Sequence, residues 1–375
     1  MTLHAHPLKH LVLLGAGHSH VHVLSTLATQ PSPDVQITLI APGPRQLSSR
    51  MVPDFVAGHY ALEECATALQ PLLKNTAVRW LTRSATALDA DARTITLDDG
   101  SELGFDWLSI NTGPVQDRQQ LEQTMPGARK HGLFVRPMET FGALWPQVAA
   151  LGKTRALRVA VIGADALGIE LAMAIRHRLP ATSVTLITGG TAVAADYPSA
   201  VQRRVVHALK RRNITVLADV VVGIQAGEVS LGCGARLVCD VPLIATGAQA
   251  PSWLGGSGLA LDAHGFIAVD DCQRSTSHGH VFAAGDVSSL VDRPRAPSGV
   301  STPSAGPALA HNLAAAAAGL EPSPHTPPRS TLNFLSCGNR QSIAHWGKHS
   351  AQGRWVWWVK DWIDRSSIKR YHRDA

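Results

Sequence analysis

Short runs of apolar residues alternate along this chain with segments whose apolar residues recur every three or four positions. Residues 11–14 and 35–40 are two such runs, and Val21, Leu24 and Leu27 lie between them at helical spacing. A run that is apolar throughout is typical of a parallel strand buried on both faces, whereas the wider spacing is typical of a helix. The pattern therefore predicts a β-α-β unit near the start of the chain.

A second unit of the same kind is predicted in the middle of the chain, with strands at residues 157–162 and 184–187 and a helix at 171–179. Residues 45–58 are expected to form a polar loop that folds over a ligand, and residues 294–303 a Pro- and Ser-rich loop. Other strands are expected at 78–81, 94–97, 107–110, 241–245 and 281–284, and other helices at 60–73, 141–151 and 308–318. This alternation predicts an α/β fold with parallel sheets.

Glycines follow the first strand of the first unit. Gly15 and Gly17 take the first two positions of a dinucleotide-binding fingerprint, where a tight turn lets the backbone approach a pyrophosphate and a helix N-terminus faces its charge. His20 stands where the third glycine is expected, so we expect either wider helix packing or a contact with the ligand. The acid that normally ends the second strand is absent, since residues 41–43 read Ala-Pro-Gly. Alone, this turn does not distinguish a nucleotide site from an ordinary strand-turn-helix.

The second unit has the first and third glycines of the fingerprint, Gly163 and Gly168. Asp165 replaces the central glycine, and its carboxylate either repels a pyrophosphate or points away from it. The acid at the end of the next strand is missing here too. Arg203 and Arg204 are candidates for a 2′-phosphate of NADP or for a solvated helix face. Two turns of this type suggest two nucleotides, and hence electron transfer between them.

Three later turns suit a ligand as well. Thr112 and Gly113 follow the strand predicted at 107–110 and allow a close backbone approach. Gly285 and Asp286 follow the strand predicted at 281–284, where an acid can hold a sugar-like hydroxyl. A further turn, at Gly306 and Pro307, opens the next predicted helix, with Pro307 at its first position and a helix dipole that stabilises negative charge on a ligand.

Charge and cysteine content narrow the class of protein. The net charge of +6 suits an anionic ligand or surface, but nucleic acid is not expected, because no basic run outside the C-terminus is interleaved with aromatic residues. The five scattered cysteines have no CxxC spacing and predict reduced, mostly buried thiols of a cytoplasmic protein. Neither a signal peptide nor an apolar stretch of roughly 18 residues is found.

His18, His20 and His22 form an alternating run that would suit a metal if it lay on a strand. The run lies at a predicted helix start, where residues two apart diverge, so no metal site is expected.

The ordered set of turns resembles the two-dinucleotide-binding-domain flavoproteins, the pyridine nucleotide-disulfide oxidoreductase superfamily. Within it the chain is most similar to the subgroup that holds type II NADH dehydrogenases, sulfide:quinone oxidoreductases and the flavin domain fused to some selenophosphate synthetases. The stretches at 17–21, 51–60 and 358–365 look like the last of these three, the flavin domain fused to selenophosphate synthetases. The resemblance implies two Rossmann-like domains, the second inserted in the first. It assigns 1–130 and 263–328 to FAD binding, 131–262 to an NAD(P)H-binding-like domain and 329–375 to a C-terminal segment.

The resemblance also implies roles for single residues. FAD would be held at the two turns opened by Gly15 and Gly285 and at the start of the last helix before the C-terminal segment. NAD(P)H would lie at the second glycine turn, with Glu170 close to the nicotinamide as the catalytic candidate; an exposed helix carboxylate is the alternative for this residue. The FAD set is Gly15, Gly17, His18, His20, Thr112, Gly113, Gly285, Asp286, Gly306 and Pro307, and the NAD(P)H set is Gly163 and Gly168.

The implied function is an FAD-dependent oxidoreductase that passes electrons from NAD(P)H through the flavin to a quinone or another small acceptor. A redox-active disulfide is not expected, because Cys65 and Cys337 are the only candidates and fit a buried thiol better. Two alternatives stay open. One is a flavoprotein that no longer uses NAD(P)H and acts on its own small substrate, and the other is a flavin-fold module with a partner in selenium metabolism.

The C-terminus bears on partners and location. Trp355, Trp358, Val359 and Trp362 share one face of a predicted helix, with basic residues, Lys360 among them, around it. Such a face suits a peripheral contact with the inner face of a membrane, or equally a cap on the flavin domain or a homodimer contact.

Overall fold

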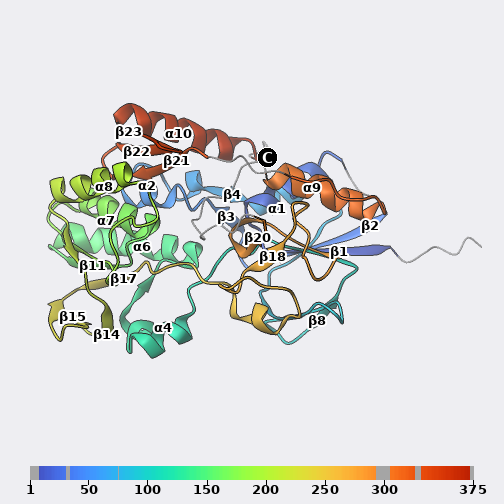
Figure 1. The fold of residues 1–375 in the computed structure, drawn as a ribbon, viewed down its shortest axis with the longest axis horizontal. Coiled ribbons are helices and arrows are strands. Elements are labelled where there is room, and N and C mark those ends of the chain that lie inside the picture. Colours follow the sequence, from blue (N-terminus) through green and yellow to red (C-terminus); the bar gives the residue numbers. More distant parts are fainter. Residues whose placement is uncertain (1–7, 31–33, 75, 293–304, 326–330, 372–375) are drawn as a thin grey trace, which may run out of the picture.

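Two parallel sheets of five strands each organise the computed structural model, which describes residues 8–30, 34–74, 76–292, 305–325 and 331–371 (Figure 1). The first sheet has the order β19-β9-β1-β2-β5 and the second the order β10-β17-β11-β12-β13. Strands of the first sheet are β1 (Lys9–Leu14), β2 (Val35–Ile40), β5 (Arg79–Leu81), β9 (Trp107–Ile110) and β19 (Val281–Ala283). Those of the second are β10 (Leu133–Phe134), β11 (Arg158–Ile162), β12 (Ser183–Ile187), β13 (Thr215–Leu217) and β17 (Val241–Ile244).

The order of strands confirms the predicted fold class. All pairings within the two sheets are parallel, and β19 joins the first sheet only after the chain has completed the second. The second α/β unit is therefore inserted in the first, and the two lie side by side in Figure 1. We propose the predicted limits of 130 and 262 as domain boundaries, and the predicted limit of 328 lies outside the described residues.

Helices and smaller sheets complete both units. The helices are α1 (His18–Leu27), α2 (Val52–Val56), α3 (Leu69–Leu73), α4 (Arg118–Thr124), α5 (Ala128–His131), α6 (Met138–Thr154), α7 (Ala166–Arg178), α8 (Ser199–Arg211) and α9 (Ala305–Ala317). Two antiparallel sheets combine β6 (Ala85–Asp89) with β7 (Thr94–Leu97) and β8 (Glu102–Gly104), and β14 (Val221–Gln225) with β15 (Glu228–Leu231) and β16 (Arg236–Val238). Two-stranded pairs are β3 (Arg45–Leu47) with β4 (Ala66–Ala68) and β18 (Ile267–Val269) with β20 (Ser288–Leu290).

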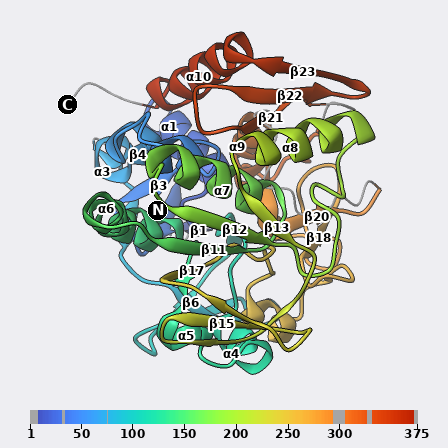
Figure 2. The ribbon, with the colours of Figure 1, turned by 90° about the vertical axis from the view of Figure 1, so that its left-hand side faces the viewer.

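A C-terminal segment covers the second unit. Its antiparallel strands are β21 (Asn333–Ser336), β22 (Ser342–Trp346) and β23 (His349–Gly353), and the long helix α10 (Arg354–Lys369) follows them. Both ribbon views show this segment over α7 and α8, and contacts join β21 to α7 and β22 to α8 (Figure 2). The segment thus closes over the helix that carries the second glycine turn.

Two local predictions are wrong. The polar loop expected at 45–58 contains the helix α2, whose apolar side chains Val52, Phe55 and Val56 lie in the core against α7. The helix expected at 60–73 is broken, because β4 pairs with β3 and leaves only a 3₁₀ turn at Glu63–Cys65 and the short α3. In both cases a long-range contact overrides the local pattern. The loop expected at 294–303 lies outside the described residues.

Candidate functional site

Asn111, directly after β9, organises the first glycine turn. Gly15 has a φ of +89°, and a Cβ there would lie 2.6 Å from the Asn111 carbonyl oxygen. A Cβ on Gly17 would collide with the Asn111 side chain, and the Gly17 amide donates to the Asn111 carbonyl at 2.9 Å. Only glycine fits either position, because the end of a neighbouring strand already occupies the space.

The same asparagine reaches the second part of the predicted flavin site. Its Nδ2 donates to the Ala284 carbonyl at 2.5 Å, and a Cβ on Gly285, whose φ is +77°, would lie 2.7 Å from that nitrogen. Its Oδ1 accepts from the amides of Ser19 and His20 at the start of α1. Three segments far apart in the sequence therefore meet at one side chain. The signal for Asn111 in the sequence is a polar residue directly after a buried apolar strand.

His20 supports the turn from inside. It is fully buried, its Nδ1 donates to the Gly15 carbonyl at 2.5 Å, and its Nε2 accepts from Ser109 Oγ at 2.8 Å. Burial lowers the pKa of His20 to about 4, so the ring is neutral at pH 7. Both ring nitrogens have protein partners, which favours the packing role over a ligand contact.

The neutral ring of His20 predicts a loss of stability in acid. An unfolded histidine has a pKa of about 6.5, so the stabilisation is present above that pH and is lost as the pH falls towards 4. Between pH 7 and pH 5 we expect the free energy of unfolding to drop by about 2 kcal/mol on this account. Urea titrations of the protein and of His20→Asn measure it. An equal pH dependence in both would contradict the assignment.

His18 and His22 lie in different surroundings from His20. Burial and the charges of Arg50, His22 and Arg370 lower the pKa of His18 to about 4, and His22 Nδ1 lies 3.1 Å from the hydroxyl of Tyr371. His18 also meets the Tyr371 ring edge-on, so the end of α10 covers the start of α1.

Asp286 and Arg136 form the polar part of the first site. Burial raises the pKa of the Asp286 carboxyl, and Arg136 opposes that rise. Asp286 has no side-chain hydrogen bond to any residue the structure describes. Arg136 follows β10 and interacts electrostatically with both Asp286 and Asp165, one acid from each predicted site. Arg136 was not among the predicted site residues, because nothing in its local sequence pattern shows that β10 brings it near both acids.

The turn after β9 and the start of α9 are the other predicted parts of the first site, and their surroundings differ. Gly113 has a φ of +72° and open space around it, and Thr112 is exposed beside it. The described part of helix α9 already includes Ala305 and Gly306, so Pro307 is not its first residue as predicted. A Cβ on Gly306 would lie 2.8 Å from the Cβ of His22, which brings the start of α9 against α1.

The second glycine turn is equally crowded. Gly163 has a φ of +120°, a Cβ there would collide with the Ala245 carbonyl, and a Cβ on Gly168 would collide with the Gly163 carbonyl. Asp165 is the N-cap of α7 and accepts from the Gly168 amide at 3.0 Å. Its carboxylate therefore turns back onto its own helix and occupies a donor that a bound phosphate would use.

A cavity of about 470 Å³ opens beside this turn. Its charged lining residues are Asp165 and Asp196, and no lysine, arginine or histidine belongs to the lining that the structure describes. Desolvation raises the pKa of Asp165, and Asp196 adds to the rise, while Gly168 and Arg136 oppose it. Neither Arg203 nor Arg204 belongs to this lining, and Arg204 Nε donates to Ser350 Oγ at 3.2 Å.

Glu170, one turn further along α7, is buried, so the alternative of an exposed helix carboxylate is wrong. Strand β21 covers this face of α7, and the Ser336 amide donates to Glu170 Oε1 at 2.6 Å. Burial raises the pKa of Glu170 to about 8, and the charge of Lys360 opposes the rise. The carboxyl is therefore mostly protonated at pH 7.

Cys65 and Cys337 are buried thiols, as expected. Cys65 Sγ donates to the Met51 carbonyl at 3.9 Å and Cys337 Sγ to the Leu335 carbonyl at 3.8 Å. Burial raises the pKa of each thiol to about 12. Neither offers the thiolate that disulfide exchange requires.

The outer face of α10 is exposed and aromatic. Trp355, Trp358 and Trp362 are 58%, 60% and 70% exposed, and Trp346 at the end of β22 is 56% exposed. Lys360, expected among the basic residues around this face, is instead buried on the inner side of α10. Among the described residues, no helix combines the length and the apolar character needed to cross a membrane.

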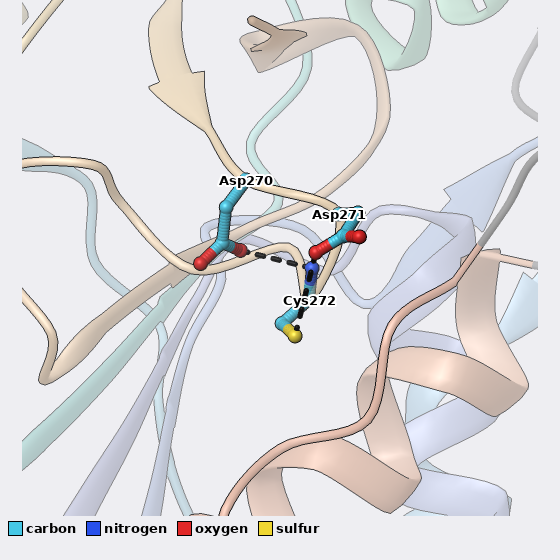
Figure 3. Close-up of side chains that lie close together, drawn as sticks. All are labelled: Asp270, Asp271 and Cys272. Carbon is cyan, nitrogen blue, oxygen red and sulfur yellow. Dashed lines mark hydrogen bonds between the residues drawn. The ribbon is translucent and has the colours of Figure 1, made fainter. Parts of the chain in front are cut away.

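Asp270, Asp271 and Cys272 form a group with ligand atoms close together (Figure 3). Asp270 Oδ1 accepts from the amides of Cys272 and Arg274 at 2.9 Å each, and Cys272 Sγ lies 3.7 Å from Asp271 Oδ1. These bonds are those of a turn closed by an aspartate, and they account for the group without an ion.

The family model of pyridine nucleotide-disulphide oxidoreductases matches residues 9–317. The chain belongs to this family. The match spans both glycine turns and Asp286, so the chain is a flavin oxidoreductase, and membership implies binding of FAD and a pyridine nucleotide.

Two curated proteins and one solved structure illustrate what this chain is similar to. A sulfide-quinone reductase of Aquifex aeolicus is 24% identical over 81% of this chain and 76% of its own length. An NADH dehydrogenase-like protein of Mycobacterium tuberculosis is 27% identical over 60% of this chain and 59% of its own length. The structure of NDH2 from Plasmodium falciparum in complex with NADH superposes with a TM-score of 0.77 at 13% identity, covering 97% of both chains, and shares the fold.

Proposed function

We propose that this chain is an FAD-dependent oxidoreductase that takes electrons from NAD(P)H and passes them through the flavin to a quinone or another small acceptor. The observation that carries the proposal is the cradle around Asn111, where Gly15, Gly17 and Gly285 leave no room for side chains. The names of the relatives supply the classes of donor and acceptor, since one is a sulfide-quinone reductase and another is NADH dehydrogenase-like.

The residues of the first site fit FAD. When bound, FAD supplies the redox centre that accepts two electrons from a donor and returns them to an acceptor. The backbone at Gly15 and Gly17 would hold its pyrophosphate, which faces the start of α1. Asp286, which has no hydrogen-bond partner among the described side chains, would accept from a ribitol hydroxyl, and Arg136 would supply positive charge beside it.

Helix α9 and the turn after β9 would complete the flavin site. The start of α9 at Gly306 and Pro307 lies against α1, where its dipole would stabilise negative charge on the pyrimidine end of the flavin. Thr112 and Gly113 would approach from the end of β9.

Glu170 is the proposed acid next to the donor. Because the Ser336 amide occupies Oε1, the proton of the neutral carboxyl lies on Oε2. Such a group donates a hydrogen bond at pH 7 and can release its proton near pH 8. No disulfide step is proposed, because Cys65 and Cys337 are buried and protonated.

A second candidate function has an observation of its own. The glycines Gly163 and Gly168 fit a dinucleotide backbone, but the carboxylate of Asp165 opposes the negative charge of a pyrophosphate. The described cavity lining contains a second acid, Asp196, and no basic residue. This supports a flavoprotein that takes electrons from another small substrate. The alternative of a flavin-fold module that works with a partner in selenium metabolism stays a prediction.

Reoxidation of the reduced flavin tests the acceptor. The protein is photoreduced without oxygen and mixed with a water-soluble quinone or with a small disulfide, and the flavin absorbance is followed. We expect the quinone to restore the oxidised spectrum within seconds and the disulfide to leave it reduced. Rapid reoxidation by the disulfide alone would overturn the proposal.

We also propose that the tryptophan face of α10 contacts a membrane surface. The exposed tryptophans of this face, with exposed Arg354 and Lys369 on the same helix, suit the lipid-water interface. Changing Trp355, Trp358 and Trp362 to serine is expected to weaken binding to anionic vesicles at least about tenfold in a sedimentation assay.

A matched control for this face is available on α6. Leu144 and Leu151 are 40% and 43% exposed there, and their change to serine is expected to leave vesicle binding unchanged. Equal vesicle binding by the tryptophan variant and the parent, with dimers that only the parent forms in gel filtration, would identify a homodimer contact instead.

A further inference from the structure

Helix α10 inserts a buried lysine beneath α2. Lys360 Nζ donates to Asp54 Oδ2 at 2.7 Å, to Asp364 Oδ2 at 2.8 Å and to the carbonyl of Arg50 at 3.0 Å. Lys360, Asp54 and Asp364 are each at most 3% exposed. A buried ammonium group is stable only with such partners, so these contacts fix α10 against α2.

Asp54 and Ser336 continue this network to Glu170. Asp54 also accepts from Trp357 Nε1 at 3.1 Å and from Ser336 Oγ at 2.9 Å, and its partners hold its pKa below the usual range although burial opposes this. Ser336 bonds Asp54 through its hydroxyl and Glu170 through its amide. One residue therefore connects the ionised cluster to the proposed catalytic carboxyl.

The charges of the cluster balance without Glu170. Asp54 and Asp364 are matched by Lys360 and by Arg50, whose guanidinium lies 2.9 Å from Asp364 Oδ1. Ionised Glu170 would add an unmatched negative charge in a buried place, which is why its pKa is raised.

Among the residues that the structure describes, the other titratable groups that interact with Glu170 are not cations. They are Cys337, beside β21, and Tyr197, before α8, and burial raises the pKa of both, so both are neutral at pH 7. The charge state of Glu170 therefore depends on the cluster that α2 and α10 form.

We propose that Asp54, Ser336 and Lys360 are positioning residues that hold the Glu170 carboxyl in place and set its charge, so that the C-terminal helix completes the site. This rests on the proposed role of Glu170 in the flavin reaction. The outer face of the same helix carries the tryptophans, and its inner face reaches the site through Lys360 and Trp357.

Two substitutions are expected to move the titration of Glu170 in opposite directions. Asp54 disfavours the ionised form of Glu170, so Asp54→Asn is expected to lower its pKa by about one unit. Lys360 favours the ionised form, so Lys360→Met is expected to raise the pKa by about one unit. Arg365→Met is the matched control, because Arg365 lies on the same helix but pairs with Glu64 and Asp361 at the surface.

The infrared band of the protonated carboxyl, followed against pH and assigned by its loss in Glu170→Gln, measures this titration without any turnover. The pH profile of flavin reduction measures it in the reaction. Opposite shifts in Asp54→Asn and Lys360→Met, with none in Arg365→Met, support the proposal. Shifts in the same direction, or none, in variants that melt cooperatively would overturn it.

Ser336→Ala keeps the proposal testable if the charge variants do not fold, since it removes only the hydroxyl bond to Asp54. It is expected to broaden the infrared band and move the titration by less than about one unit. If the infrared band and the titration of Ser336→Ala match those of the parent, Ser336 does not position Glu170 and the proposal is overturned. If the infrared shifts appear while flavin reduction has no pH dependence, the proposed role of Glu170 fails and the positioning holds.

Discussion

Replacing Asp165 with glycine is expected to tighten the binding of NADH at least tenfold, which is about 1.4 kcal/mol. The carboxylate at this position already accepts from the Gly168 amide, a donor that a pyrophosphate would use. Two unit charges about 4 Å apart repel by about 4 kcal/mol at an effective dielectric constant of about 20, and exposure to the cavity reduces this. The dissociation constant is measured by anaerobic calorimetric titration of the photoreduced protein, to which NADH binds without reducing the flavin.

Asp165→Asn separates charge from shape in this experiment. Asparagine keeps the helix cap and the volume, so its effect on NADH binding reports the charge alone. Asp196→Asn removes the other acid of the described lining and is expected to have a smaller effect, because it is Asp165 that accepts from the Gly168 amide of the turn. Unchanged NADH binding in both Asp165 variants would show that the carboxylate does not oppose the dinucleotide.

Replacing Gly15 with alanine is expected to remove most of the bound FAD. The new Cβ would lie 2.6 Å from the Asn111 carbonyl, so the turn must move away from the end of β9. We expect the purified variant to hold less than about a tenth of the parent's flavin, as measured by the visible spectrum after reconstitution, because only a fully formed turn brings the backbone to the pyrophosphate.

Gly100→Ala is the matched control for this change. Gly100 has a similar φ of +81°, but a Cβ there meets nothing within 4 Å. It therefore carries the same backbone strain, roughly 1–2 kcal/mol, without the collision. Equal flavin content in the two variants would mean that the turn at Gly15 does not hold FAD.

Local patterns in the sequence predicted much of the fold. The apolar runs and the glycines that follow them located both β-α-β units, because strand and turn preferences act over a few residues. The broken helix at 60–73 and the buried α2 were missed, since β3 and α7 override local preference there.

The site was harder to predict than the fold. Glu170 accepts a hydrogen bond from Ser336, which lies 166 positions further along the chain. Lys360 donates to Asp54, which lies 306 positions away. Lys360 follows the spacing of a basic surface residue, and no local pattern shows that it faces inward. Arg136 was missed for the same reason, because its importance comes from two acids that only the folded chain brings near it.

Anaerobic mixing of the purified protein with NADH or NADPH, followed at the flavin absorbance band, tests whether a nicotinamide nucleotide is the electron donor. We expect one of the two nucleotides to bleach the band and a quinone then to restore it. A yellow protein that dithionite reduces but neither nucleotide reduces, even in large excess, would contradict the proposed donor and favour a flavoprotein with another substrate. A colourless protein that cannot be reconstituted with FAD would contradict the account as a whole.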